Sequence, residues 1–224
     1  MRIKFCLYAL LLCTLPSPSQ TAADSSTGSV QGMVLDDNGK PLAGAVVYGL
    51  PSENMQEQIR TTADASGRFM LERLPAGDVH LHAYKEDDGY PDSTFAFYRT
   101  SEHEWVRVSV RSGKTIRDIT IQLGVRAAHL NIALTNEDGS SLNDGAQLVF
   151  TRSDMPGPYR RGVSAKESLM VPAVPFRLTV EADGYEPWHY GGKEWQSIAG
   201  LITLKSGETL DLSVQLQQSR ASDH

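Results

Sequence analysis

Residues 79–84 read Val-His-Leu-His-Ala-Tyr, and they decide the class of the fold because apolar and polar side chains alternate along them. Successive side chains of a β-strand point to opposite faces, so this pattern predicts a strand with one buried face and one polar face. No segment of twelve or more residues has sustained helical periodicity. The sequence therefore predicts an all-β protein built as antiparallel β-sandwiches. The same alternation recurs in the stretches 30–34, 119–123, 176–181 and 210–216.

The chain also repeats itself in four blocks that keep the same order. The pairs are Asp36–Gly39 with Asn136–Gly139, Asp88–Tyr90 with Asp183–Tyr185, Val110–Thr115 with Leu204–Thr209, and Ile119–Leu123 with Leu212–Leu216. Ordered repetition predicts two homologous domains, residues 28–124 and 125–217, flanked by a disordered linker (24–27) and a disordered tail (218–224). Because almost no linker separates the two bodies, we expect them to touch and to move little against each other.

Four blocks of the first repeat follow the pattern of a known family. They are Gly28–Val34, Gly39–Val47, Thr61–Phe69 and Leu74–Gly77. With them, the segment 28–123 resembles the carboxypeptidase regulatory-like domain, whose fold is a transthyretin-like (prealbumin-like) β-sandwich. The second half is similar in a looser way and looks like a diverged copy, since it lacks the Pro-Leu-Ala-Gly-Ala block of the first. The resemblance implies a non-catalytic accessory domain of an exported protein.

The first 23 residues have the pattern of a secretory signal peptide. Arg2 and Lys4 precede a short apolar run over residues 5–15, and small residues follow up to Ala23. A charged start, a short apolar centre and small residues at the cleavage point predict a signal peptide over residues 1–23. A membrane span needs about 20 apolar residues, so we expect no transmembrane segment in the mature chain. The predicted location is secreted, periplasmic or extracellular.

Composition excludes several classes of chemistry. Both cysteines, Cys6 and Cys13, lie inside the predicted leader, so the mature chain would have no disulfide, thiolate nucleophile or cysteine metal ligand. Lipidation at Cys13 is disfavoured, because Leu12 stands where a lipoprotein signal has a small residue. The formal net charge of the whole chain is −6. An acidic surface repels polyanions, which argues against a nucleic-acid partner.

One motif suggests a metal-dependent enzyme. His80, His82 and Tyr84 share one face of the predicted strand, a spacing that could provide three metal ligands. The alternative is that these side chains form an ordinary polar face. Residues 79, 81 and 83 are apolar and are expected to be buried, so the histidines would face solvent or the other domain. No zinc-protease helix motif, nucleophile elbow or phosphate-binding glycine loop occurs. We therefore predict no catalytic residue, no metal site and no cofactor.

Aromatic residues in corresponding Gly- and Pro-containing stretches of the two repeats are the candidate ligand-binding residues. Aromatic rings stack on the apolar faces of sugars, and they also anchor protein partners. The alternative is that they fill the ends of the sandwiches or the seam between them. The candidates are Trp105, Tyr185, Trp188, Tyr190 and Trp195.

These observations favour a secreted, non-catalytic β-sandwich protein that acts as a binding or scaffolding module outside the cytoplasm. Its partner would be a glycan or an exported or cell-envelope protein. Two other functions stay open at this point. The first is a carbohydrate-binding module that uses the loop aromatics, and the second is a metal-dependent enzyme that uses His80 and His82.

Overall fold

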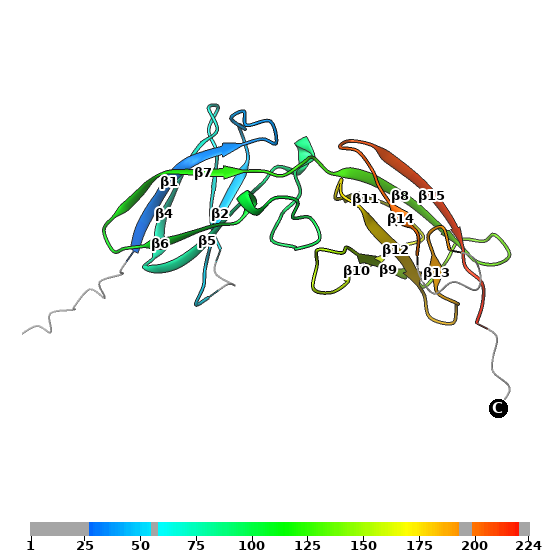
Figure 1. The fold of residues 1–224 in the computed structure, drawn as a ribbon. Helices are drawn as coiled ribbons and strands as arrows, with labels where there is room; N and C mark the ends of the chain where they lie inside the picture. Colours follow the sequence, from blue (N-terminus) through cyan, green and yellow to red (C-terminus); the bar gives the residue numbers. More distant parts are fainter. Residues whose placement is uncertain (1–26, 55–57, 193–198, 220–224) are drawn as a thin grey trace, which may run out of the picture.

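The computed structural model of the chain describes residues 27–54, 58–192 and 199–219. In Figure 1 the strands form two bodies side by side, which the chain joins directly after β7. The described residues contain only two short 3-10 helices besides strands, η1 (Glu86–Asp88) and η2 (Glu102–Glu104). No helix within these ranges has the length and apolar character needed to cross a membrane. The all-β class predicted from the sequence is confirmed; the predicted leader lies outside the described residues.

The first body is a sandwich of two sheets, which we call the first sandwich. One sheet has the strand order β4-β1-β7 and the other has the order β3-β2-β5-β6. Their facing sides enclose one hydrophobic cluster, which includes Val79, Leu81 and Ala83 at zero exposure. The strands are β1 (Thr27–Leu35), β2 (Val46–Pro51), β3 (Ile59–Thr62), β4 (Arg68–Pro75), β5 (Gly77–Tyr84), β6 (Val106–Val110) and β7 (Thr115–Gln122).

The second body is built in the same way, and we call it the second sandwich. One sheet has the order β11-β8-β15, and the other has the order β10-β9-β12-β13, with β14 also paired to β12. A separate hydrophobic cluster lies between them. The strands are β8 (Ala128–Thr135), β9 (Ala146–Thr151), β10 (Tyr159–Val163), β11 (Lys166–Val171), β12 (Phe176–Glu181), β13 (Trp188–His189), β14 (Leu201–Ile202) and β15 (Thr209–Gln215).

The two sandwiches correspond strand by strand in their three-stranded sheets. In the first, β1 pairs antiparallel with β4 and parallel with β7; in the second, β8 pairs antiparallel with β11 and parallel with β15. Each sandwich therefore contains one parallel pair among otherwise antiparallel neighbours. This correspondence supports the proposal that residues 28–124 and 125–217 are two repeats.

Asx turns explain the repeated acidic-glycine blocks. In the first sandwich Asp36 Oδ1 accepts hydrogen bonds from the backbone N–H groups of Asn38 and Lys40, at 2.9 and 2.8 Å. In the second, Asp138 Oδ1 accepts from the backbone N–H of Ser140 at 2.9 Å. Such local bonds, with Gly at positive φ, close a tight turn. These carboxylates therefore fix the turns that follow β1 and β8.

Candidate functional site

A loop between β5 and β6 covers the outer face of the four-stranded sheet of the first sandwich; we call residues 91–105 the crossing loop. Tyr48 of β2 and His82 of β5 are paired neighbours outside the hydrophobic cluster, yet their exposed fractions are 1% and 0%. The Tyr48 hydroxyl donates a hydrogen bond of 2.5 Å to Asp92 Oδ1. The indole ring of Trp105 lies with its centroid 5.1 Å from that of His82. The crossing loop thus buries a polar face that would otherwise meet water.

The two histidines of β5 have different surroundings. His80 Nδ1 accepts a hydrogen bond of 2.5 Å from Trp105 Nε1, whereas His82 stacks on Tyr48 with 5.4 Å between the ring centroids. Within residues 27–54, 58–192 and 199–219, neither ring nitrogen of His82 has a hydrogen-bond partner. The expectation that the histidine face meets solvent or the other domain is wrong for His82, because the crossing loop covers it. In the part of the chain that the structure describes, no cluster of three or more His, Cys, Asp or Glu side chains could hold a metal ion.

Burial keeps the covered rings uncharged at neutral pH. Loss of hydration lowers the pKa of His82 to about 4, assisted by the positive charge of Arg99 and by His80, while Asp92 opposes the shift. The pKa of the Tyr48 hydroxyl is raised, mainly by burial and to a smaller extent by the hydrogen bond to Asp92. A neutral imidazole and a neutral phenol are the forms of these side chains that an apolar environment tolerates best.

The middle of the crossing loop enters the second sandwich. Phe97 is fully buried and belongs to the hydrophobic cluster of the second sandwich. Its ring stacks on Tyr159, with centroids 4.7 Å apart and an interplanar angle of 7°, and its centroid lies 4.6 Å from that of Phe150. Aromatic pairs at such distances stabilise a core beyond the area that they bury. A residue from the first half of the chain therefore completes the core of the second sandwich.

Arg152 fastens the backbone of the crossing loop at the same place. Its side chain is buried, and Nη1 donates a hydrogen bond of 2.5 Å to the carbonyl oxygen of Phe97. Nε and Nη2 donate to the carboxylate of Asp154 at 3.0 and 2.5 Å. A buried guanidinium is costly unless its N–H groups have partners, and its charge strengthens the bonds that it donates. Arg152 thus acts as a polar clamp beside the Phe97 ring.

The connection between the sandwiches is held as well. The backbone N–H of Val125 donates to Thr100 Oγ1 at 3.1 Å, and that of Ala127 donates to the carbonyl oxygen of Gly89 at 2.8 Å. The carboxylate of the buried Glu104 accepts from the backbone N–H of Thr100 at 3.0 Å. The two bodies touch, as the short connection predicts. Phe97 and Arg152 were missed by the sequence analysis, because nothing in their neighbourhood marks a contact between the two halves.

The described aromatic residues singled out from the sequence are divided between the two sandwiches. Trp105, the last residue of the crossing loop, is partly buried against His80 and His82 of the first sandwich. Trp188 and Tyr190 lie 6.4 Å apart, centroid to centroid, and both pack against the hydrophobic cluster of the second sandwich. Tyr185 packs there too, while Trp195 lies outside the described residues. A ligand-binding role for this set stays a prediction.

Tyr185 has a structural partner that can be tested. Its hydroxyl donates a 2.7 Å hydrogen bond to Asn136 Oδ1, as the Tyr90 hydroxyl does to Asp37 Oδ1 at 2.8 Å in the first sandwich. We expect Tyr185→Phe to lower the free energy of unfolding by about 1 kcal/mol, because one hydrogen bond is lost and the ring is kept. Urea unfolding followed by fluorescence measures this. Tyr90→Phe is the matched variant, and unchanged unfolding midpoints in both would contradict the role given to these hydroxyls.

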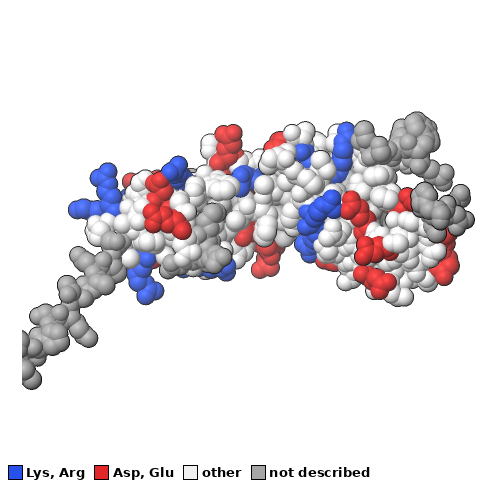
Figure 2. Space-filling view, turned by 90° about the horizontal axis from the view of Figure 1, so that it is seen from below, with Lys and Arg blue, Asp and Glu red and all other residues white. Residues whose placement is uncertain are grey.

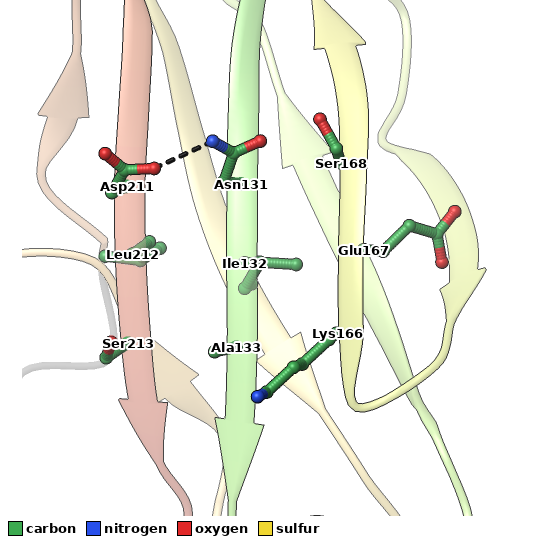
Figure 3. Close-up of a pocket in the computed structure, with 9 residues that line it drawn as sticks. All are labelled: Asn131, Ile132, Ala133, Lys166, Glu167, Ser168, Asp211, Leu212 and Ser213. Atoms are coloured by element: carbon green, nitrogen blue, oxygen red, sulfur yellow. Dashed lines mark hydrogen bonds between the residues drawn. The ribbon is translucent and has the colours of Figure 1, made fainter.

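The surface offers a shallow depression on the three-stranded sheet of the second sandwich (Figure 3). Its volume is about 470 Å³. Asn131 Nδ2 donates a 2.7 Å hydrogen bond to Asp211 Oδ1 across it, and Glu167 points away from it. No aromatic ring among the described residues lines this depression, so these residues offer no stacking platform for a sugar. On the face seen in Figure 2, basic and acidic side chains are interspersed. The lining residues are Asn131, Ile132, Ala133, Lys166, Glu167, Ser168, Asp211, Leu212 and Ser213.

Solved structures with weak overall similarity include a Bacillus anthracis protein and two streptococcal pilins. The TIE protein of Bacillus anthracis has 15% identity and a TM-score of 0.33, with 86% of this chain and 34% of that chain covered. The streptococcal ancillary pilin has 12% identity and a TM-score of 0.33, with 88% and 64% covered. The minor pilin GBS52 of Streptococcus agalactiae has 11% identity and a TM-score of 0.36, with 88% and 98% covered. The chain thus spans about a third of the first of these proteins and 64% of the second.

The family comparison is more specific. No curated protein matches the chain. The matched family segment begins within β1 and runs through the end of β8, so it covers the first sandwich from Ser29 onward, the crossing loop and the first strand of the second sandwich. It agrees with the resemblance that the blocks of the first repeat carry. Residues 29–135 of the chain match the carboxypeptidase regulatory-like domain family.

Proposed function

We propose that the protein is an exported, non-catalytic binding or scaffolding module that acts outside the cytoplasm. In this proposal its two β-sandwiches are held together and work as one unit. The observation that carries this proposal is the insertion of Phe97, from the first half of the chain, into the hydrophobic core of the second sandwich. A module with this construction would present the surfaces of both sandwiches to a partner at a fixed spacing.

The reasoning starts from what linked domains usually do. Domains of one chain move relative to each other unless the interface between them is large and apolar. Here the interface contains a fully buried aromatic ring, stacked on Tyr159, and a buried arginine that binds the backbone of the same residue. Separating the sandwiches would expose that ring and leave Arg152 without one of its acceptors. The closed arrangement is therefore favoured by burial and by hydrogen bonding together.

Export and lack of catalysis rest on other observations. The charged, apolar and small-residue pattern of residues 1–23 supports export. The match to a regulatory-like domain over residues 29–135 supports an accessory role. Within the described residues, the histidine pair of β5 is occupied by structural contacts with Trp105 and Tyr48. These contacts favour a structural role for His80 and His82, the two histidines that a metal-dependent enzyme would use as ligands.

The proposal predicts that the distribution of distances between the two sandwiches is narrow and that its width depends on Phe97. Spin labels at Lys40→Cys and Lys205→Cys, in a chain with Cys6→Ser and Cys13→Ser, report this distance by pulsed electron paramagnetic resonance. Both positions are exposed, and their turns lie on either side of the junction along the upper edge of Figure 1. We expect one narrow distribution at neutral pH, which broadens in Phe97→Ala because the buried ring that holds the loop is removed.

Phe95→Ala is the matched control. Phe95 lies in the same loop but is 54% exposed, so its loss should leave the distribution narrow. A broad distribution in the unmodified loop, or equal widths with Phe97 and with alanine at that position, would overturn the proposal of a rigidly held pair.

A further inference from the structure

His82 is the one fully buried side chain in the described residues whose two ring nitrogens both lack a hydrogen-bond partner. A neutral imidazole has one N–H donor and one acceptor, whereas the protonated ring has two donors and a charge. Burial without partners is therefore tolerable for the neutral ring and very unfavourable for the protonated one. The pocket that holds His82 therefore strongly favours the neutral ring over the protonated one.

The rings around His82 come from two parts of the chain. Tyr48 stacks on one side from β2, with the ring planes 21° apart. The ring of Trp105, at the end of the crossing loop, has its centroid 5.1 Å from that of His82. Because His82 is fully buried, lifting this loop would remove Trp105 from the imidazole and open it to water. Detachment of the crossing loop would therefore hydrate His82.

No charged neighbour in the described part of the chain forms a hydrogen bond with His82. The charge of Asp92 attracts a proton to His82, but its carboxylate already accepts hydrogen bonds from the hydroxyls of Tyr48 and Thr94. Arg99, whose guanidinium carbon lies 3.8 Å from the centroid of the Trp105 ring, repels the proton. The remaining groups are His80, Tyr84 on the same strand, Arg60 over the Tyr48 ring, and Glu104 beside Arg99.

We propose that the crossing loop is an acid-released latch, which closes over neutral His82 and withdraws Phe97 from the second sandwich when His82 binds a proton. The inference rests on the proposed function, because release has a consequence only if Phe97 holds the sandwiches together. The coupling is built into the chain: Asp92 and Trp105 bind the first sandwich at the two ends of the loop, and Phe97 binds the second from its middle.

The sign of the pH effect follows from the two states of the ring. Burial lowers the pKa of His82 from 6.5 to about 4 in the closed loop, while the hydrated ring of the open loop keeps the ordinary value. The open state therefore binds more protons between these values, and closure weakens as the pH falls from 6.5 to 4. At pH 5 the opening equilibrium should be about 30-fold larger than at pH 7.5. Glu104, whose pKa is raised by burial, titrates in the opposite sense.

Hydrogen exchange of the full chain tests the latch. The backbone N–H of Tyr98 is hydrogen-bonded to the carbonyl oxygen of Phe95 inside the loop, so its protection reports closure. After correction for the intrinsic rate, we expect protection at pH 5 to be about 30-fold lower than at pH 7.5 in the wild type. In His82→Phe, which keeps a ring between Tyr48 and Trp105 and cannot titrate, this loss should disappear. His103→Gln, at an exposed position of the same loop, should behave as the wild type.

Each outcome separates the latch from the proposed function. Equal pH dependence in wild type and His82→Phe, or none in wild type, would overturn the latch while the narrow distance at neutral pH still supported the rigid pair. If His82→Phe does not fold, the ring carbon shifts of His82 in the wild type decide. We expect them to titrate together with loop exchange, and titration without loop opening would overturn the latch. A Phe97→Ala chain with unbroadened distances at neutral pH would overturn the proposed function itself.

Discussion

Phe97→Ala is expected to lower the free energy of unfolding of the second sandwich by about 3–5 kcal/mol. The ring is fully buried among Phe150, Tyr159 and Phe176, so alanine would lose its apolar burial and leave a cavity in the core. The unusual feature of this loss is its origin, since the mutated residue precedes β8, the first strand of the sandwich that it destabilises. Urea unfolding, followed by hydrogen exchange of amides in β9 and β12, measures the loss where it occurs.

The same measurements on Phe95→Ala give the matched comparison. Phe95 is two residues away and exposed, and its ring centroid lies 6.5 and 6.4 Å from those of Tyr98 and Tyr159. Its loss should cost less than about 1 kcal/mol. Equal effects of the two alanine substitutions on the second sandwich would contradict the role assigned to Phe97.

Gly32→Ala should destabilise the first sandwich by about 3 kcal/mol. The pairing of β1 with β7 shifts register at this point, so that Val30 lies opposite Ile116 and Gly32 opposite Ile119. A Cβ atom at position 32 would overlap the carbonyl oxygen of Ile119 and lie 2.8 Å from Cζ of the buried Phe69. Neither neighbour can move without disturbing the strand or the core. Thermal unfolding followed by circular dichroism measures the expected loss.

Gly162→Ala is the control for this substitution. Gly162 lies in β10, where an added Cβ would meet nothing within 4 Å. Alanine also loses less conformational entropy than glycine on folding, so this variant should be neutral or slightly more stable. A loss at Gly162 as large as that at Gly32 would show that the effect does not come from the crowded register shift.

The local pattern of the sequence predicted much of the fold. Alternation at 79–84 placed Val79, Leu81 and Ala83 in the core, where all three are fully buried. This success has a physical reason, because the side-chain direction in a strand follows directly from the backbone. The repeated turn blocks predicted corresponding strands in the two halves in the same way. What alternation cannot predict is the fate of the second face of a sheet, and His82 on that face is buried rather than exposed.

The contact between the two sandwiches could not be predicted from the sequence. Phe97 sits among several aromatic residues of an irregular loop, and no periodicity distinguishes the ring that enters the second core from Phe95, which stays exposed. Arg152 is a charged residue directly after a strand, where the prior expectation is exposure to water. Both positions are determined by contacts between residues distant in sequence.

The parallel pairs β1–β7 and β8–β15 have a consequence for the chain under load. In each sandwich they join the first strand to the last, and the start of one lies at the opposite end from the finish of the other. A pull on the two ends of either sandwich therefore acts in shear, and all the bonds between the pair resist together. An antiparallel terminal pair would instead peel apart one bond at a time. Tension along this polypeptide meets its strongest resistance between the first and the last strand of each body.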